Sequence, residues 1–155
     1  MNTFNVALLF AILSISIPST AFALEKNVFM YTYELNVKEL QKLSTHTIET
    51  STPWRESRTY KGYFLSDILS LLDFHSDDLQ LCAFDDYCAM IPHTDVITYN
   101  PIVAYEADGI RLTMRDDGPF FLVYPIDSTY ELQNAPLVFA RLVRHVKTIS
   151  WGLKE

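Results

Sequence analysis

Apolar and polar residues alternate along most of this 155-residue chain in short runs, the period of β-strands that bury one face. The predicted strands cover residues 28–34, 46–50, 59–64, 102–106, 110–114, 120–124 and 147–151. Two further runs within residues 79–91 flank Asp85 and Asp86, and this arrangement predicts a β-hairpin.

Helical periodicity is clearest at residues 65–73. Leu65, Ile68, Leu69 and Leu72 recur at the i, i+3, i+4 and i+7 positions, and Ser66 and Asp67 favour an N-terminal turn. Residues 36–43 predict a shorter helix, and residues 137–146 fit a helix or a strand equally well. Many short strands with one or two helices indicate an α+β fold that is mostly β.

The N-terminal segment has the pattern of an export signal. Residues 1–23 contain no Lys, Arg, Asp or Glu, and residues 6–17 are apolar apart from two serines. Ala21, Phe22 and Ala23 then form an A-x-A cleavage signal. We expect a signal peptide over residues 1–23, cleaved after Ala23, and one domain over residues 24–155; an uncleaved membrane anchor is the alternative.

Composition narrows the choice of ligands. The formal net charge is −7, and all of it lies in the predicted mature chain, because the signal segment is uncharged. An acidic domain repels phosphate backbones, which argues against nucleic acid as a partner. Aromatic residues make up 14% of the chain and include nine tyrosines, which suggests that some rings line a cavity or an interface.

The only two cysteines, Cys82 and Cys88, lie in the predicted hairpin. A two-residue turn places their side chains on opposite faces, whereas a three-residue loop places Cys82 directly opposite Cys88. We expect free, buried thiols, because a domain with a real core does not require a cross-link. Two cysteines and scattered histidines do not make a zinc ligand set.

Trp54 is the first candidate for a binding residue. It follows Pro53 at the end of a predicted strand, with Thr52 and Arg55 on either side. A core tryptophan beside a turn explains the pattern as well as a binding residue does. In the functional interpretation, the indole stacks on a planar heterocycle, and Thr52 and Arg55 lie near its edge.

The hairpin tip is the second candidate. Asp85 and Asp86 are ordinary turn residues, but one acid is enough for the turn, which leaves the other free. An ionised carboxylate can accept two parallel N–H donors from an amino-pyrimidinone edge. We therefore predict that Asp86 and Tyr87 contact a ligand.

Residues 115–119 are the third candidate, because Arg115, two aspartates and a Gly-Pro pair lead into an apolar strand. A guanidinium can hold the carbonyl and ring nitrogen of a heterocycle in one plane, although an ion pair with a neighbouring Asp would be of little value at a surface. Tyr124, at the far end of the strand, would present its hydroxyl to the same ligand.

Motifs of catalysis are absent from the sequence. It contains no Gly-x-Ser-x-Gly, P-loop or Rossmann glycine run, so no catalytic residue is predicted.

Arg141, Arg144, His145 and Lys147 form a basic cluster on an acidic chain. Such a cluster is usually a solvated face; here it is also a candidate contact for a partner protein.

Residues 47–151 resemble the sulfite-oxidase-type molybdopterin-binding domain. The resemblance rests on six short segments in order: Thr52-Pro53-Trp54, residues 61–69, residues 84–87 with Ile91-Pro92, residues 107–109, residues 114–119, and Tyr124-Pro125. In the full enzymes, a cysteine a few residues before an aromatic like Trp54 ligates molybdenum. Thr50 or Ser51 stands there in this chain, and a hydroxyl is a poor replacement for thiolate.

The resemblance implies a function. One branch of the family is similar to exported pterin-binding proteins that act as ligand-sensing partners of membrane-bound cyclic-di-GMP enzymes. It implies here a periplasmic, non-enzymatic protein that binds a pterin without molybdenum, through Thr52, Trp54, Arg55, Asp86, Tyr87, Arg115 and Tyr124. Its partner would be the periplasmic domain of a membrane-bound diguanylate cyclase or phosphodiesterase. The alternatives are a molybdopterin-dependent oxidoreductase with a non-thiolate metal site, and a structural adaptor with an empty cleft.

Overall fold

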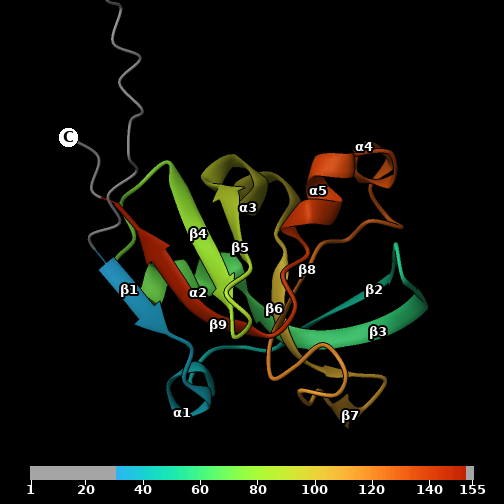
Figure 1. Ribbon diagram of the computed structural model, residues 1–155, viewed down its shortest axis with the longest axis horizontal. Helices are drawn as coiled ribbons and strands as arrows, with labels where there is room; N and C mark the ends of the chain where they lie inside the picture. Colours follow the sequence, from blue (N-terminus) through green and yellow to red (C-terminus); the bar gives the residue numbers. More distant parts are fainter. Residues whose placement is uncertain (1–30, 153–155) are drawn as a thin grey trace, which may run out of the picture.

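The computed structural model describes residues 31–152 (Figure 1). The predicted signal peptide and residues 28–30 of the first predicted strand lie outside this range. The strands are β1 (Tyr31–Glu34), β2 (His46–Thr52), β3 (Arg55–Phe64), β4 (Asp78–Ala83), β5 (Cys88–Pro92), β6 (Ile102–Ala107), β7 (Ile110–Arg111), β8 (Phe121–Val123) and β9 (Val146–Trp151). The helices are α1 (Val37–Leu40), α2 (Leu65–Leu71), α3 (His93–Tyr99), α4 (Tyr130–Gln133) and α5 (Pro136–Arg141).

The strands form two antiparallel sheets. Sheet A has the order β1-β9-β4-β5, and sheet B has the order β2-β3-β6-β7, with β8 also paired to β6. Figure 1 shows sheet A on the left, sheet B on the right, and α4 and α5 at the upper right beyond the end of the β2–β3 hairpin. The predicted α+β class with mostly β content is confirmed.

The core lies where the two sheets and the helices meet. Residues 102–104 of β6 and all of β8 are fully buried, which is why these strands read as continuous apolar runs and not as alternating ones. Gly62 of β3 lies against β6, and a Cβ atom there would be 2.2 Å from the carbonyl oxygen of Val103. The absence of a side chain at this position therefore lets the two strands approach.

Most predicted elements are present, with shifted ends. The helix predicted at 65–73 is α2, and the short helix at 36–43 is α1, where the Asn36 side chain caps the Lys38 N–H at 2.9 Å. The predicted strand at 110–114 shrinks to β7, which has two residues. The ambiguous stretch 137–146 divides into α5, a loop and the start of β9.

Two helices were not predicted, namely α3 and α4. Helix α3 begins at His93, and its C-cap residue, Asn100, adopts the left-handed conformation (φ 47°). Within residues 31–152, no helix has the length and apolar content needed to cross a membrane, since the longest have seven residues.

The expectation of free, buried thiols is wrong: Cys82 and Cys88 form a disulfide. The hairpin has a three-residue loop, so Cys82 faces Cys88 directly with a Cα–Cα distance of 4.1 Å. Asp86 has a positive φ of 64°, the left-handed position that such loops require at their third residue. Cys88 is exposed and Cys82 half-buried, on the face of β4 opposite the core. A disulfide is compatible with export to an oxidising compartment.

Candidate functional site

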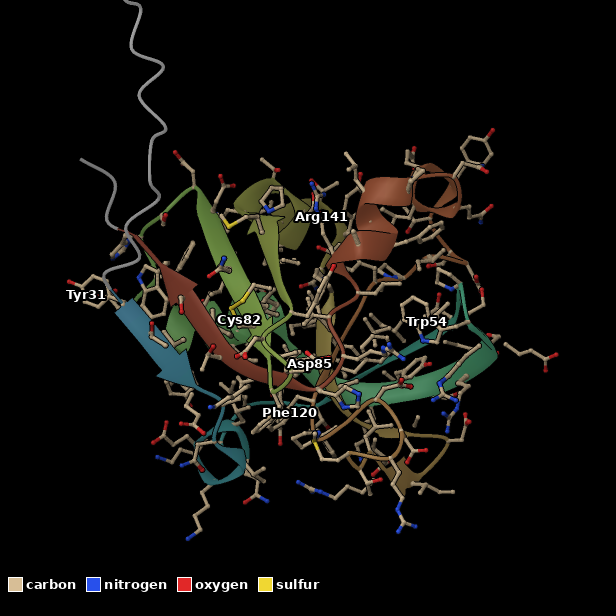
Figure 2. The ribbon with its side chains drawn as sticks, in the orientation of Figure 1. Tyr31, Trp54, Cys82, Asp85, Phe120 and Arg141 are labelled. Atoms are coloured by element: carbon tan, nitrogen blue, oxygen red, sulfur yellow. A yellow bond between two sulfur atoms is a disulfide. The ribbon has the colours of Figure 1, made fainter. Side chains whose placement is uncertain are left out.

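The first candidate site is a hollow of about 280 Å³, which we call the Trp54 hollow. The Trp54 hollow is lined by residues from the β2–β3 turn, the β4–β5 hairpin, α5 and the loop before β9. Figure 2 shows Trp54 and Asp85 on these two separate hairpins, with α5 above both. The lining residues are Trp54, Asp85, Tyr87, Phe139, Leu142, Arg144 and His145.

The indole of Trp54 is 42% exposed, too open for an ordinary core tryptophan. The guanidinium carbon of Arg144 lies 5.0 Å from the centroid of the ring, within the range of a cation–π contact. The Arg144 side chain is itself 48% exposed. A planar ligand can extend this stack on the guanidinium or replace the guanidinium on the indole.

A buried carboxylate behind the hollow organises these arginines. Asp117 is fully buried and accepts a hydrogen bond from Arg55 Nε at 2.8 Å, and Arg144 Nη1 lies 3.8 Å from its other oxygen. The hydrogen bond to Asp117 is the largest cause that raises the pKa of Arg55 above its usual value. Arg55 thus positions Asp117 and does not line the hollow.

His145 joins the loop before β9 to the turn at residues 115–119. Its ring Nδ1 lies 2.6 Å from the carbonyl oxygen of Gly118, and its backbone N–H donates to the carbonyl of Asp117 at 3.0 Å. Because a carbonyl only accepts, Nδ1 carries a proton and donates it to Gly118. Phe84 N–H donates to the His145 carbonyl at 3.0 Å, which holds the hairpin tip against the same loop.

The hairpin contributes Asp85 and not the predicted Asp86. Asp86 occupies the left-handed turn position, while Asp85 lines the hollow and accepts the Tyr87 N–H at 3.2 Å. Tyr87 is 47% exposed, and its hydroxyl donates to the carbonyl of Ala140 in α5 at 2.6 Å. The predicted Tyr87 therefore lies in the wall of the hollow, tied to α5.

A second hollow of about 310 Å³, the Thr52 hollow, lies next to the first. The two share Phe139, and Pro53 in the second is the chain neighbour of Trp54 in the first. The lining residues of the Thr52 hollow are Ser51, Thr52, Pro53, Ile126, Asp127, Gln133 and Phe139. The predicted Thr52 and Trp54 are thus divided between two adjoining hollows.

Two predicted residues lie elsewhere. Arg115 is exposed on the turn before Asp117 and lines neither hollow. Tyr124 is fully buried, and its hydroxyl donates to Asp95 Oδ2 at 3.1 Å. Arg141 Nη1 donates to the same oxygen at 2.6 Å. Arg141 is therefore bound to a buried acid, which leaves Arg144 and Lys147 as the exposed arginine and lysine of the predicted basic cluster.

Replacement of Tyr124 with phenylalanine is expected to reduce stability by about 1 kcal/mol at neutral pH, through the lost hydrogen bond to Asp95. Burial, and then the charge of Asp95, raise the pKa of Tyr124 above its usual value. The folded state therefore favours the neutral phenol. The stabilisation that the neutral phenol of Tyr124 gives to the folded state is complete below about pH 10 and is lost as the pH rises further. Urea unfolding should show the difference between wild type and Tyr124→Phe shrinking above about pH 10. A constant difference would contradict this assignment.

The residues at the expected molybdenum position do not fit that metal. Thr50 is fully buried, and its hydroxyl donates to the Ser51 carbonyl and accepts the Asp127 N–H. The Ser51 hydroxyl donates to Asp127 at 2.6 Å. Both cysteines of the chain are in the disulfide, so no thiolate is free to ligate. Residues 31–152 also contain no cluster of three His, Cys, Asp or Glu side chains suited to a metal ion.

Several lining residues were not predicted as ligand contacts, because they converge only through the fold. Arg144 and His145 had been assigned to a partner-binding patch, and Asp85 to the turn. The sequence signal that could have identified Asp117 is the charged segment 115–119, because it leads directly into a buried apolar strand. No protein-family model matches this chain, and a search of curated proteins finds no significant match.

Proposed function

We propose that this chain is a periplasmic, non-enzymatic pterin-binding protein with a sulfite-oxidase-like fold. It would act as a ligand-responsive partner of a membrane-bound cyclic-di-GMP enzyme. The observation that supports this function best is the Trp54 hollow, where an exposed indole, a guanidinium and a carboxylate converge. The groups that could ligate molybdenum support binding without redox chemistry. Both cysteines form the disulfide, and the Thr50 and Ser51 hydroxyls are hydrogen-bonded to Asp127.

The hollow matches the chemistry of a pterin. Its volume is near the lower end of the range for small-molecule sites, which suits a bicyclic ring. A pterin has an amino-pyrimidinone edge with parallel N–H donors, and the Asp85 carboxylate can accept two of them. The Arg144 guanidinium can stack on the face of the bicycle or, from its edge, donate to the ring carbonyl. A cationic donor and an anionic acceptor beside one aromatic platform would thus define the orientation of the ring.

The direct test is calorimetric titration of the mature protein with oxidised pterin, together with fluorescence of material extracted from protein purified from the periplasm. We expect saturable binding and a fluorescent extract. Elemental analysis of the same preparation should find molybdenum well below one atom per chain. Near-stoichiometric molybdenum would favour the oxidoreductase, and absence of both binding and fluorescence would favour an adaptor without a ligand.

Trp54→Ala is expected to weaken pterin binding by about 1–3 kcal/mol, the range for stacking of a base on an aromatic side chain. Because the indole is half-exposed, folding should be nearly unchanged. Tyr130→Ala is the matched control, since this ring is 78% exposed and lines neither hollow. Equal affinity of both variants, measured by calorimetry, would remove Trp54 from the binding site.

A pair of arginine variants tests how the ligand edge is recognised. Arg144→Ala should weaken pterin binding at least about tenfold, because it removes the cationic group that stacks on the ligand or donates to its edge. Arg115→Ala should leave affinity unchanged if the ligand lies in the Trp54 hollow, because Arg115 is exposed outside it. The reverse outcome would restore the prediction that Arg115 holds the heterocycle, and would place the ligand outside this hollow.

The partner hypothesis requires that the loaded and empty forms differ in affinity for a membrane enzyme. A useful coupling free energy is about 1–3 kcal/mol. The hairpin tip, α5 and the loop before β9 all border the Trp54 hollow, so a ligand there can affect the exposed surface that they form. Capture from solubilised membranes, with and without pterin, should recover a diguanylate cyclase or phosphodiesterase in a ligand-dependent manner. Recovery of no such enzyme under either condition would contradict the signalling hypothesis.

A further inference from the structure

We propose that the Cys82–Cys88 disulfide is a site of thiol–disulfide exchange, at which a dithiol redox protein controls the conformation of the β4–β5 hairpin tip. Neither cysteine lines the Trp54 hollow or the Thr52 hollow. Figure 2 shows the sulfur of Cys82 next to the tip that carries Asp85. The effect of the exchange on ligand affinity rests on the proposed function, whereas the exchange itself does not.

The first observation is that the sulfur atoms are accessible. Cys82 and Cys88 lie on the outer face of sheet A, where Cys88 is exposed and Cys82 is half-buried. Their neighbours on this face are Gln80, Met90 and Thr148, which are uncharged and at least half-exposed. A dithiol can therefore reach the bond without displacing a core side chain or a charged group.

The second observation is that the fold depends little on the bond. The cross-link closes a loop over residues 82–88, and a cross-link stabilises least when the loop is short. Strand β4 pairs with β9 on one side and with β5 on the other, and the core-facing side chains of β4 and β5 are buried. The hairpin therefore keeps its pairing when the disulfide is open.

The third observation is what the closed loop carries. Of the residues between the two cysteines, Asp85 and Tyr87 line the Trp54 hollow. Asp86 stands between them with a φ of 64°, a conformation that is unfavourable for a residue with a side chain. The cross-link excludes conformations to which this turn would otherwise relax. The bond therefore acts mainly on the tip and not on the fold.

The exchange takes two steps. A thiolate of the dithiol attacks Sγ of the exposed Cys88, the S–S bond breaks, and Cys82 leaves as a thiolate that takes a proton from water. The second thiol of the partner, after losing its proton to water, attacks the mixed disulfide and releases Cys88, which is protonated in turn. The chain gains two electrons and two protons, and the dithiol becomes a disulfide. An oxidised partner reverses both steps, because Cys82 and Cys88 remain opposite each other.

Reduction loosens the tip without detaching it. The hydrogen bonds from Phe84 to the loop before β9 and from Tyr87 to α5 do not involve the cysteines. What is lost is the restriction on residues 83–87 that holds Asp85 in place. We expect reduced protein to bind pterin about three- to tenfold more weakly, as when about 10–30% of molecules have a binding-competent tip. By linkage, bound pterin makes the disulfide harder to reduce by the same factor.

The first experiment measures exchange in the native protein. The mature chain is treated with dithiothreitol at several sub-denaturing urea concentrations, and the thiols are trapped by alkylation and counted by intact mass. We expect two thiols per chain, at a rate that urea does not change, because the sulfur is accessible without unfolding. A rate that rises with urea as unfolding does, or loss of the circular dichroism spectrum on reduction, would show a structural cross-link and overturn the proposal.

The second experiment measures the tip. The double variant Cys82→Ser/Cys88→Ser represents the open form, and we expect faster amide hydrogen exchange in residues 83–87 than in oxidised wild type. Gln80→Ala is the matched control, since this residue is beside the disulfide on the same face. Reduced wild type supplies the same comparison if the double variant does not fold. Equal exchange at the tip in the open and oxidised forms would overturn the proposal.

Calorimetric titration of the oxidised and reduced proteins with pterin separates this inference from the proposed function. If pterin binds in neither redox state, the proposed function fails, while the thiol counts and the hydrogen exchange still decide whether the disulfide is an exchange site. If pterin binds both forms equally tightly, pterin binding stands, and control of the hollow by the disulfide is refuted.

Discussion

Asp117→Ala is expected to lower the free energy of unfolding by about 3 kcal/mol and to abolish pterin binding. The carboxylate is fully buried and accepts the Arg55 Nε–H, with the Arg144 guanidinium close to its second oxygen. Its removal leaves two guanidinium groups close together without a counter-ion. Removal of one partner of a buried pair costs about 3–5 kcal/mol, and the exposure of the two arginines places this case at the lower end.

The loss of binding follows from the same geometry. Without Asp117, Arg144 has no buried anchor and is repelled by Arg55, so its position over Trp54 is lost. Urea denaturation and calorimetric titration measure the two effects. Asp116→Ala is the matched control, because Asp116 is exposed in the same turn, where it accepts the Thr113 hydroxyl at 3.2 Å. If both variants were equally stable, Asp117 would not organise the site.

Gly62→Ala is expected to destabilise the protein by about 3 kcal/mol, near the upper end of overpacking effects in cores. The new Cβ would lie 2.2 Å from the Val103 carbonyl oxygen and 2.5 Å from Ala104 Cα. Both atoms belong to the backbone of a buried central strand, which cannot move aside as a flexible side chain can. The pairing of β3 with β6 must therefore open locally.

Gly109→Ala is the control that separates the steric clash expected at Gly62 from the general effect of replacing a glycine with alanine. A Cβ at Gly109 meets nothing within 4 Å, but its φ of +77° is strained for alanine. The expected cost is about 1 kcal/mol, set by the backbone alone. Thermal unfolding of both variants measures the comparison. Similar melting temperatures for the two would show that β3 and β6 tolerate the extra atom.

The mostly β architecture and helix α2 could be predicted from the sequence, because they depend on local periodicity. Residues 65, 68, 69 and 72 share one helical face in any context, and the apolar runs of β6 and β8 can only be buried. Trp54 and Tyr87 could be identified as candidates because aromatic residues beside turns are recognisable in the sequence, whereas their exposure is known only from the structure. Their convergence on one hollow could only be tested in three dimensions.

Register and long-range contacts depend on the tertiary structure. The three-residue hairpin loop, with Asp86 in the left-handed conformation, decides that Cys82 faces Cys88 and that Asp85 lines the hollow. The pattern of residues allows either loop length, and a one-residue difference reverses every side chain. Packing of the whole domain selects between them.

The ion pairs likewise could not be predicted from the sequence. Sequence alone indicates that Arg115, Asp117, Arg141 and Arg144 are available for ion pairs, but it does not indicate their partners. Asp95 and Arg141 are 46 positions apart, and Arg55 and Asp117 are 62 apart. Such pairs form only once β-sheet pairing has brought distant segments together, so burial, not residue type, decides which arginine meets a ligand and which stabilises the fold.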